Sequence, residues 1–218
     1  VGIDAPQSPS QLSFVDYHDG TGLLQWTPVL NVGINGGYVN PELVAYCLTD
    51  DSGHVVAENV NGTHFDMSGL FLGAPQQEVT YYVEAKNEAG SSAKTSTEVL
   101  LLGEPYHAPY FEGFDNAVYQ NGPWRSTTLV GKSYNAKWSP RVDQDQDGNG
   151  GSADFQGYLQ GGVARLSSPK IDVSQLAKPK LSFWCLFKES GNKNLKLQFS
   201  TDFGEWEDVA TIGGVGGS

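Results

Sequence analysis

The alternation of apolar and polar side chains in residues 79–92 is the feature that most constrains the fold of this chain. In the stretch VTYYVEAKNEAGSS, one side of an extended strand would carry Val79, Tyr81, Val83 and Ala85. A period of two marks a half-buried strand, because successive side chains of a strand point to opposite faces. Other short apolar runs are separated by turns rich in Gly, Asn, Asp and Pro, and no long segment has the period of a helix. The sequence therefore predicts an all-β protein.

A change in charge divides the chain near residue 104. Residues 1–104 carry two basic and thirteen acidic side chains, a net charge of −11, whereas residues 105–218 carry eleven and twelve, a net charge of −1. The stretch GEPYHAP, residues 103–109, contains two prolines and a glycine, as linkers between domains commonly do. We therefore predict one domain in residues 1–104 and a second in residues 105–218.

The charge and the apolar runs disfavour several classes of partner. A net charge of −12 repels phosphate, which argues against nucleic acids and anionic membranes. No apolar run approaches the roughly 20 residues that cross a bilayer, so we expect no membrane span in this segment. The cysteines, Cys47 and Cys185, are too few for a disulfide framework. We expect two structural thiols, with a disulfide between the two halves as the alternative.

The first half resembles a fibronectin type III domain across residues 5–102. The residues that carry the resemblance are Pro6, Trp26, the pair Tyr46-x-Leu48 and the stretch VEAKNEAGSS at 83–92. The resemblance implies an immunoglobulin-like β-sandwich with Trp26 in its core, and a spacer or interaction module rather than an enzyme. One departure concerns the tyrosine corner of that family, which would fall on Val79.

Two alternating stretches in the second half predict further strands. In residues 181–187 one face would carry Leu181, Phe183, Cys185 and Phe187, and in residues 195–199 one face would carry Leu195, Leu197 and Phe199. The apolar set of such a strand turns toward a core. We therefore expect Leu181, Phe183, Leu195, Leu197 and Phe199 to be buried.

Four stretches of the second half are similar to the jelly-roll domains of the MAM family and of the cleaved-adhesin modules of bacterial surface proteins. They are FEGFDN at 111–116, LSSPKIDVS at 166–174, KLSFWCLF at 180–187 and LQFSTDFGEWEDVATI at 197–212. The resemblance implies a jelly-roll β-sandwich in a secreted or cell-surface bacterial protein. The last strands of those domains have no counterpart after Ile212, so we expect residues 105–218 to form a domain truncated at its C-terminus.

The acidic segment DQDQDGNGGSAD, residues 143–154, predicts a calcium loop. Calcium takes hard oxygen ligands, and in an EF-hand loop these recur at alternate positions before a glycine at the sixth. Asp143, Asp145 and Asp147 match the first, third and fifth positions, Asn149 would offer its backbone carbonyl at the seventh, and Asp154 stands at the twelfth. An aspartate at the twelfth position is one methylene shorter than the usual glutamate. The alternative is a solvated acidic turn whose like charges repel one another.

Two further sets of residues are candidates for binding. The resemblance to adhesin modules implies a second metal site at Glu112 and Asp115, although two carboxylates alone are weak support. β-Sandwich proteins that bind sugars use exposed aromatic platforms beside polar loops. The candidates for such a platform are Trp124, Trp138, Tyr158 and Trp184, and the alternative for each is packing in a core or against a sheet.

The sequence contains no recognisable catalytic motif. It lacks G-x-S-x-G, H-E-x-x-H, a P-loop and a Cys/His pair, so we expect no enzyme activity. We predict a non-catalytic adhesion or accessory binding module of a bacterial secreted or cell-surface protein, with structural Ca²⁺ and with a host or bacterial surface protein or a glycan as partner. The alternatives are a carbohydrate-binding module attached to an extracellular hydrolase, and a structural spacer. Exposed aromatic side chains in a row would favour the carbohydrate-binding module.

Overall fold

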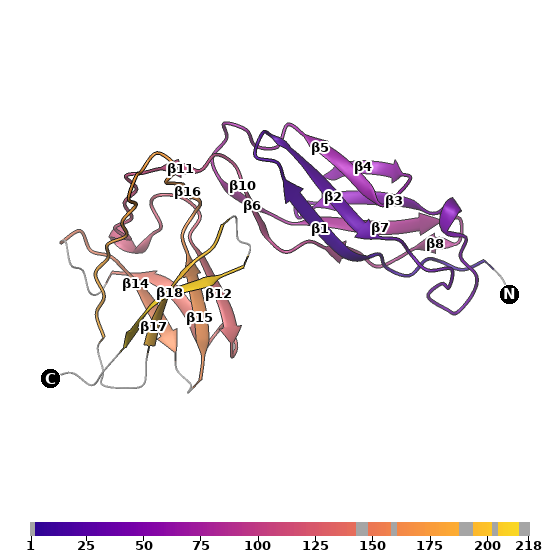
Figure 1. Cartoon of the computed structure of the whole chain (residues 1–218). Helices are drawn as coiled ribbons and strands as arrows, with labels where there is room; N and C mark the ends of the chain where they lie inside the picture. The colour runs from indigo at the N-terminus through magenta and orange to yellow at the C-terminus, as the bar shows by residue number, and fades with distance from the viewer. Residues whose placement is uncertain (1–2, 143–147, 158–160, 188–193, 202–204, 214–218) are drawn as a thin grey trace. The chain divides into compact units, whose positions relative to one another are not determined.

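The chain is all-β, as the alternation of its side chains predicts (Figure 1). A computed structural model describes residues 3–142, 148–157, 161–187, 194–201 and 205–213. Within these residues the helices are two short 3-10 turns, η1 (Pro41–Leu43) and η2 (Asp115–Ala117), and neither is long and apolar enough to cross a membrane. The chain divides into two compact units, Val1–Glu104 and Pro105–Ser218.

Unit 1 contains two main antiparallel sheets. One has the strand order β1-β2-β5, with the bounds Ser10–Asp16, Thr21–Thr27 and His64–Ser68. The other has the order β4-β3-β7-β8, with the bounds Val55–Val60, Ala45–Asp50, Tyr81–Asn87 and Gly90–Ser91, and β9 (Thr95–Ser96) also pairs with β7. A separate antiparallel pair joins β6 (Gln77–Val79) to β10 (Leu100–Leu102).

Both sheets of unit 1 contribute side chains to one core. Tyr81, Val83 and Ala85 of β7 are between 0% and 3% exposed, which confirms the inward face predicted from the alternation. Trp26 of β2 is 5% exposed, as predicted, and its ring lies edge-on to that of Tyr46 with 5.2 Å between centroids. Other buried members of this core are Leu12, Leu24, Val29, Val39, Val44, Leu48, Met67, Val79 and Leu102.

The buried carboxylate of Asp4 organises the N-terminal segment of unit 1. It accepts hydrogen bonds from the backbone N–H of Asn35 at 2.7 Å and of Gly37 at 3.0 Å, and from the Asn35 amide at 2.9 Å. The hydrogen bond from the Asn35 side chain is the main reason that the pKa of Asp4 is lowered. The carbonyl of Asp4 accepts from Nδ2 of Asn87 at 2.8 Å, and Thr95 Oγ1 donates to the carbonyl of Pro9 at 2.5 Å. Two side-chain hydrogen bonds thus tie the segment before β1 to the end of β7 and to β9.

Unit 2 is built from paired strands. The antiparallel pairs are β12 (Arg125–Val130) with β15 (Val163–Ser167), β13 (Ala136–Arg141) with β14 (Ser152–Gly157), and β17 (Asn194–Phe199) with β18 (Glu207–Gly213). A short parallel pair joins β11 (Tyr106–His107) to β16 (Ile171–Asp172). Side chains link two of these pairs, since Trp138 Nε1 donates to the carbonyl of Ala164 at 3.0 Å and its backbone N–H donates to Ser126 Oγ at 2.8 Å.

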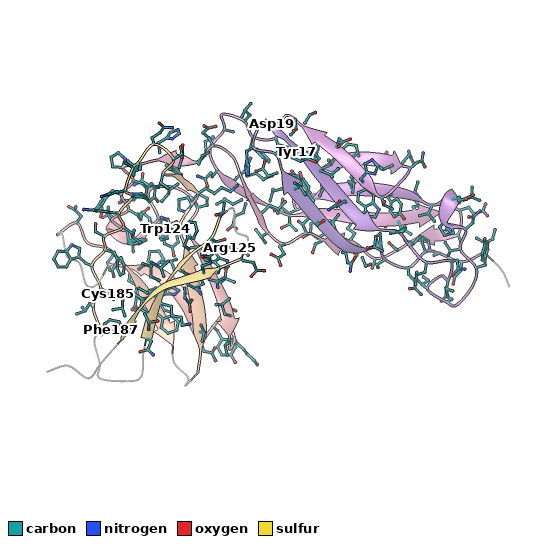
Figure 2. The ribbon with its side chains drawn as sticks, in the orientation of Figure 1. Tyr17, Asp19, Trp124, Arg125, Cys185 and Phe187 are labelled. Carbon is teal, nitrogen blue, oxygen red and sulfur yellow. The ribbon has the colours of Figure 1, made fainter. Side chains whose placement is uncertain are left out.

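The predicted strand at residues 181–187 is wrong. These residues form no strand, and Leu181 and Phe183 are 69% and 46% exposed, so their predicted burial is also wrong. Cys185 is exposed and Phe187 lies near it on the same segment (Figure 2). The physical reasons are that no strand in the described part of the chain pairs with the backbone of this segment, and that no layer covers its apolar side chains, which stay exposed.

The burial predicted for Leu195, Leu197 and Phe199 is wrong. The strand itself forms as β17, but Phe199 is 56% exposed, and Leu195 and Leu197 are of intermediate exposure. The neighbouring β18 pairs with β17 edge to edge, which satisfies the backbone without covering a face. Both cysteines of the chain are free thiols, so the disulfide considered as an alternative is not formed.

Candidate metal centre in the second unit

Glu112 holds the turn that precedes β12. Its carboxylate accepts hydrogen bonds from three backbone N–H groups: from Phe114 at 2.9 Å, from Asn121 at 2.9 Å and from Gln120 at 3.1 Å. A carboxylate with several backbone donors is well stabilised in its charged form and fixes the loop around it. Glu112 therefore has a structural role in this turn whether or not a metal binds there.

Asp115 presents a buried oxygen that has no hydrogen-bond donor among the described residues. Its Oδ1 is inaccessible to solvent and unpartnered in the structure, although buried polar atoms are nearly always paired. The oxygen lies directly over Gly113, where a Cβ would overlap it. An unpartnered buried carboxylate oxygen is a site that a cation would stabilise, because it supplies a hard ligand whose desolvation has no other compensation.

Gly151 brings the end of the acidic segment against the turn that contains Asp115. Gly151 is buried, and a Cβ at this position would overlap the carbonyl group of Phe114. Only glycine allows two backbones to approach this closely. In the sequence, residues 143–154 and the pair Glu112 and Asp115 are two separate candidate sites. The structure brings the backbone of Gly151 against that of Phe114 and Asp115, so the glycine-rich end of the acidic segment lies beside this turn.

The structure describes only two of the five predicted ligands of the acidic segment. Asp143, Asp145 and Asp147 lie outside the described residues, so their prediction stays untested. Asn149 is exposed in the turn before β14. Asp154 lies within β14, where its Oδ2 is 3.3 Å from Nε of Arg141. This ion pair competes with the predicted role of Asp154 as the last calcium ligand. Among the described residues alone, no group of three or more His, Cys, Asp or Glu side chains is arranged to hold a metal ion.

Trp124 packs among aromatic side chains instead of forming an open platform. Its Nε1 donates to the hydroxyl of Tyr110 at 2.9 Å, and its ring is edge-on to Phe114 with 5.2 Å between centroids (Figure 2). Burial raises the pKa of Tyr110 to about 12, and the hydrogen bond from Trp124 opposes this shift. The hydroxyl of Tyr110 donates to the carbonyl of Asn121. Asn121 thus joins this aromatic cluster to the turn that Glu112 holds, because its carbonyl accepts from Tyr110 and its N–H donates to Glu112.

The other platform candidates do not form a row in the described part of the chain. Trp138 is half-buried, hydrogen-bonded to the carbonyl of Ala164 and tilted against Phe155. Trp184 is 79% exposed, on the segment that forms no strand. Tyr158 lies outside the described residues. Of the four candidates, Trp184 alone is shown to expose its ring.

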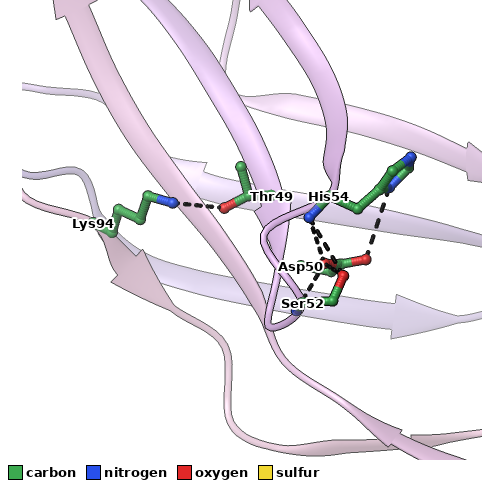
Figure 3. A network of polar contacts seen from close by, with 5 residues as sticks. All are labelled: Thr49, Asp50, Ser52, His54 and Lys94. Carbon is green, nitrogen blue, oxygen red and sulfur yellow. Dashed lines mark hydrogen bonds and ion pairs between the residues drawn. The ribbon is translucent and has the colours of Figure 1, made fainter.

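At the turn between β3 and β4, polar groups form hydrogen bonds with one another (Figure 3). Oδ1 of Asp50 accepts from the Ser52 hydroxyl at 2.6 Å and from the backbone N–H groups of Ser52 and His54, each at 2.9 Å. The hydroxyl of Ser52 is the main cause of the lowered pKa of Asp50. Nearby, Lys94 Nζ donates to Thr49 Oγ1 at 3.0 Å. The network fixes a turn and leaves Asp50 little capacity for a ligand.

Two contacts of the candidate site were not foreseen from the sequence. The approach of Gly151 to Phe114 joins residues that are far apart in the chain, and the only signal was the glycine-rich end of the acidic segment. The unpartnered oxygen of Asp115 depends on the fold of its turn, where Phe114 adopts φ 58°.

Comparison with solved structures found a weak fibronectin type III-like neighbour. A solved structure described as "Structure of FN3tt mut" is similar at 18% sequence identity and a TM-score of 0.32, covering 42% of this chain and 91% of that chain. A likeness at this level carries no argument about function. No family model and no curated protein matches the chain.

Proposed function

We propose that the chain is a non-catalytic binding module of a bacterial secreted or cell-surface protein, in which calcium holds the second unit. Unit 1 would be a fibronectin type III spacer, and unit 2 a jelly-roll domain of the MAM or cleaved-adhesin type. The observation that carries the calcium proposal is the unpartnered buried oxygen of Asp115, in a turn whose backbone Gly151 approaches. A cation bound at this point would take oxygen ligands from both the turn and the acidic segment, and would thereby hold the two together.

The proposed ion is structural. Calcium has no redox chemistry, and its preferred ligands are the carboxylate and carbonyl oxygens that the two segments offer. Asp115, Asp143, Asp145, Asp147 and the carbonyl of Asn149 would supply them. A polar glycine-rich segment buries little apolar area, so its ordering needs another source of free energy. Calcium that binds the folded state alone would add about 2.7 kcal/mol of stability at 100 times its dissociation constant.

The test is thermal unfolding of the whole chain with excess Ca²⁺ and with a chelator. We expect calcium to raise the midpoint of unit 2, and we expect Asp115→Asn and Asp145→Ala each to remove most of that increase. Gln146→Ala is the matched control from the same segment and should keep it. Equal midpoints with and without calcium, together with no heat of binding at millimolar Ca²⁺, would reject the proposal.

Glu112→Gln separates the role of the turn from that of the ion. Because Glu112 accepts three backbone N–H groups, the amide should lower the midpoint of unit 2 in chelator as well as in calcium. Asp115→Asn should act differently, since its oxygen has no protein donor to lose. A loss of stability that is the same for Asp115→Asn with and without calcium would contradict a metal role for Asp115.

A carbohydrate-binding module remains the second candidate function. The specific observation in its favour is the exposed ring of Trp184, with 46% of Phe183 exposed beside it. Trp124 and Trp138 are half-buried and pack against other aromatic rings, which weighs against a platform made of the predicted residues. A glycan array probed with wild-type protein and with Trp184→Ala would show whether this ring contacts a sugar. Binding that the substitution leaves unchanged would remove Trp184 from the site.

A further inference from the structure

Arg165 in unit 2 is a half-buried cation that has no carboxylate partner among the residues that the structure describes. Arg141, another of the arginines of this chain, lies 3.3 Å from Asp154. Arg165 forms no ion pair with any carboxylate in the described ranges; its Nε instead donates to Oε1 of Gln198 at 3.0 Å. A charged group that is taken partly out of water is normally paired, because desolvation destabilises the charged form. Consistently, burial lowers the pKa of Arg165.

The neighbours of Arg165 fix its position without neutralising it. The guanidinium lies over the ring of Trp206, 4.2 Å from the centroid. Gln198 uses both ends of its amide, since Nε2 donates to Oδ1 of Asp208 at 2.8 Å. The other oxygen of Asp208 is 2.7 Å from Nζ of Lys196. The nearby carboxylate is therefore committed to Lys196 and Gln198, and the terminal nitrogens of Arg165 have no acceptor among the described residues.

We propose that Arg165 and Trp206 form a binding site for an acidic sugar, with the sugar carboxylate on the guanidinium. A guanidinium offers parallel N–H groups that match the two oxygens of a carboxylate. Because the guanidinium covers one face of the indole, a pyranose ring would contact the edge or the other face of Trp206, where aromatic residues offer an apolar surface to C–H groups. A net charge of −12 disfavours a dianion such as phosphate more than it disfavours a monoanion. The inference rests on the proposed function as a binding module and adds the class of its ligand.

The test follows the Nε–Hε resonances of the arginines by NMR in the full chain with calcium present. The probes are sodium glucuronate, glucose, acetate and inorganic phosphate. Glucose has the same ring as glucuronate without the carboxylate, and acetate has the carboxylate without the ring. We expect glucuronate to shift the Arg165 resonance saturably, with weaker effects of acetate and phosphate and no effect of glucose. An equal response to glucose, an equal or stronger response to acetate or phosphate, or no response to glucuronate would overturn the proposal.

Two substitutions test whether Arg165 is the residue that binds the carboxylate. Arg165→Gln should abolish glucuronate binding measured by calorimetry, and Arg165→Lys should weaken it about tenfold, because an ammonium lacks the planar fork. Lys178→Gln removes one positive charge from an exposed position of the same unit and should leave the affinity unchanged. Unchanged binding in Arg165→Gln, or an equal loss in Lys178→Gln, would also overturn the proposal. The wild-type ligand series decides the question if either Arg165 variant fails to fold. The stabilisation by calcium is measured in a separate unfolding experiment. A failure of the proposed calcium site can therefore be distinguished from a failure of the proposed sugar site.

Discussion

Deletion of the Trp26 ring tests whether one core stabilises unit 1. Trp26 is 5% exposed, and its ring packs edge-on against Tyr46. Removing a buried aromatic side chain costs about 3–5 kcal/mol, since the apolar contacts are lost and a cavity remains. For a domain of about 100 residues each kcal/mol lowers the midpoint by about 4–8 °C. Trp26→Ala should therefore lower the midpoint of unit 1 by at least about 12 °C.

Trp184→Ala is the matched control, because it deletes the same ring from a position that is 79% exposed. A substitution at such a position usually changes stability by less than about 0.5 kcal/mol. Trp26→Phe is a second comparison. The indole N–H of Trp26 is buried without an acceptor, so the phenyl ring loses volume but also removes an unsatisfied donor. It should cost clearly less than Trp26→Ala.

The assay must report on each unit separately. Pulse-labelling hydrogen exchange with mass spectrometry across a urea series does this, because peptides from 79–92 report on unit 1 and peptides from 152–157 on unit 2. Trp26→Ala should shift the transition of the first peptides and leave that of the second unchanged. If Trp26→Ala and Trp184→Ala shifted unit 1 equally, or if Trp26→Ala left it unchanged, the assignment of Trp26 to a stabilising core would be refuted.

Two predictions concern pH. The pKa of Asp50 is lowered in the folded state, chiefly by the Ser52 hydroxyl, so its contribution to stability is present above the unfolded pKa and lost as pH falls through the folded value. Asp50→Asn should remove that part of the acid dependence, as unfolding curves at neutral and acidic pH would show; an unaltered dependence would contradict it. Burial raises the pKa of Tyr81 and of Tyr110 to about 12, so both contributions are complete below the unfolded pKa and are lost as pH rises through the folded value. Ultraviolet titration should show late-ionising phenols, and Tyr81→Phe with Tyr110→Phe should remove two of them and leave Tyr119, whose pKa burial also raises; ordinary titration of all tyrosines in wild type would contradict this.

In unit 1 the strand β7 was predictable from a signal of its own, and the burial of Trp26 from the resemblance to fibronectin type III domains. The alternation at residues 79–92 specifies both the strand and its buried face, and Trp26 is a large apolar side chain in a short strand-forming run. Residues 181–187 carry the same pattern, yet their side chains are exposed. Alternation states which side chains a strand would bury, whereas burial also requires a second layer, and the pattern contains no information about that layer.

The candidate site was predictable in residue type and not in arrangement. Aspartates at alternate positions before a glycine are a local signal for calcium, and it can be found without a structure. The contact of Gly151 with Phe114 and the pairing of Asp154 with Arg141 depend on how strands and turns meet. For the same reason the sequence contains no signal that marks Arg165 as a binding residue. An arginine becomes informative only when its burial and its missing partner are known.

The ties of the N-terminal segment have a mechanical consequence. A pulling force applied at the N-terminus reaches the hydrogen bonds of Asp4 and Pro9 before it reaches β1, because both residues precede that strand. These bonds connect to Asn87 and Thr95, which belong to the other sheet of unit 1. The load is therefore shared between both sheets from the start. Strand β1 cannot be peeled from β2 until the bonds to Asn87 and Thr95 have broken.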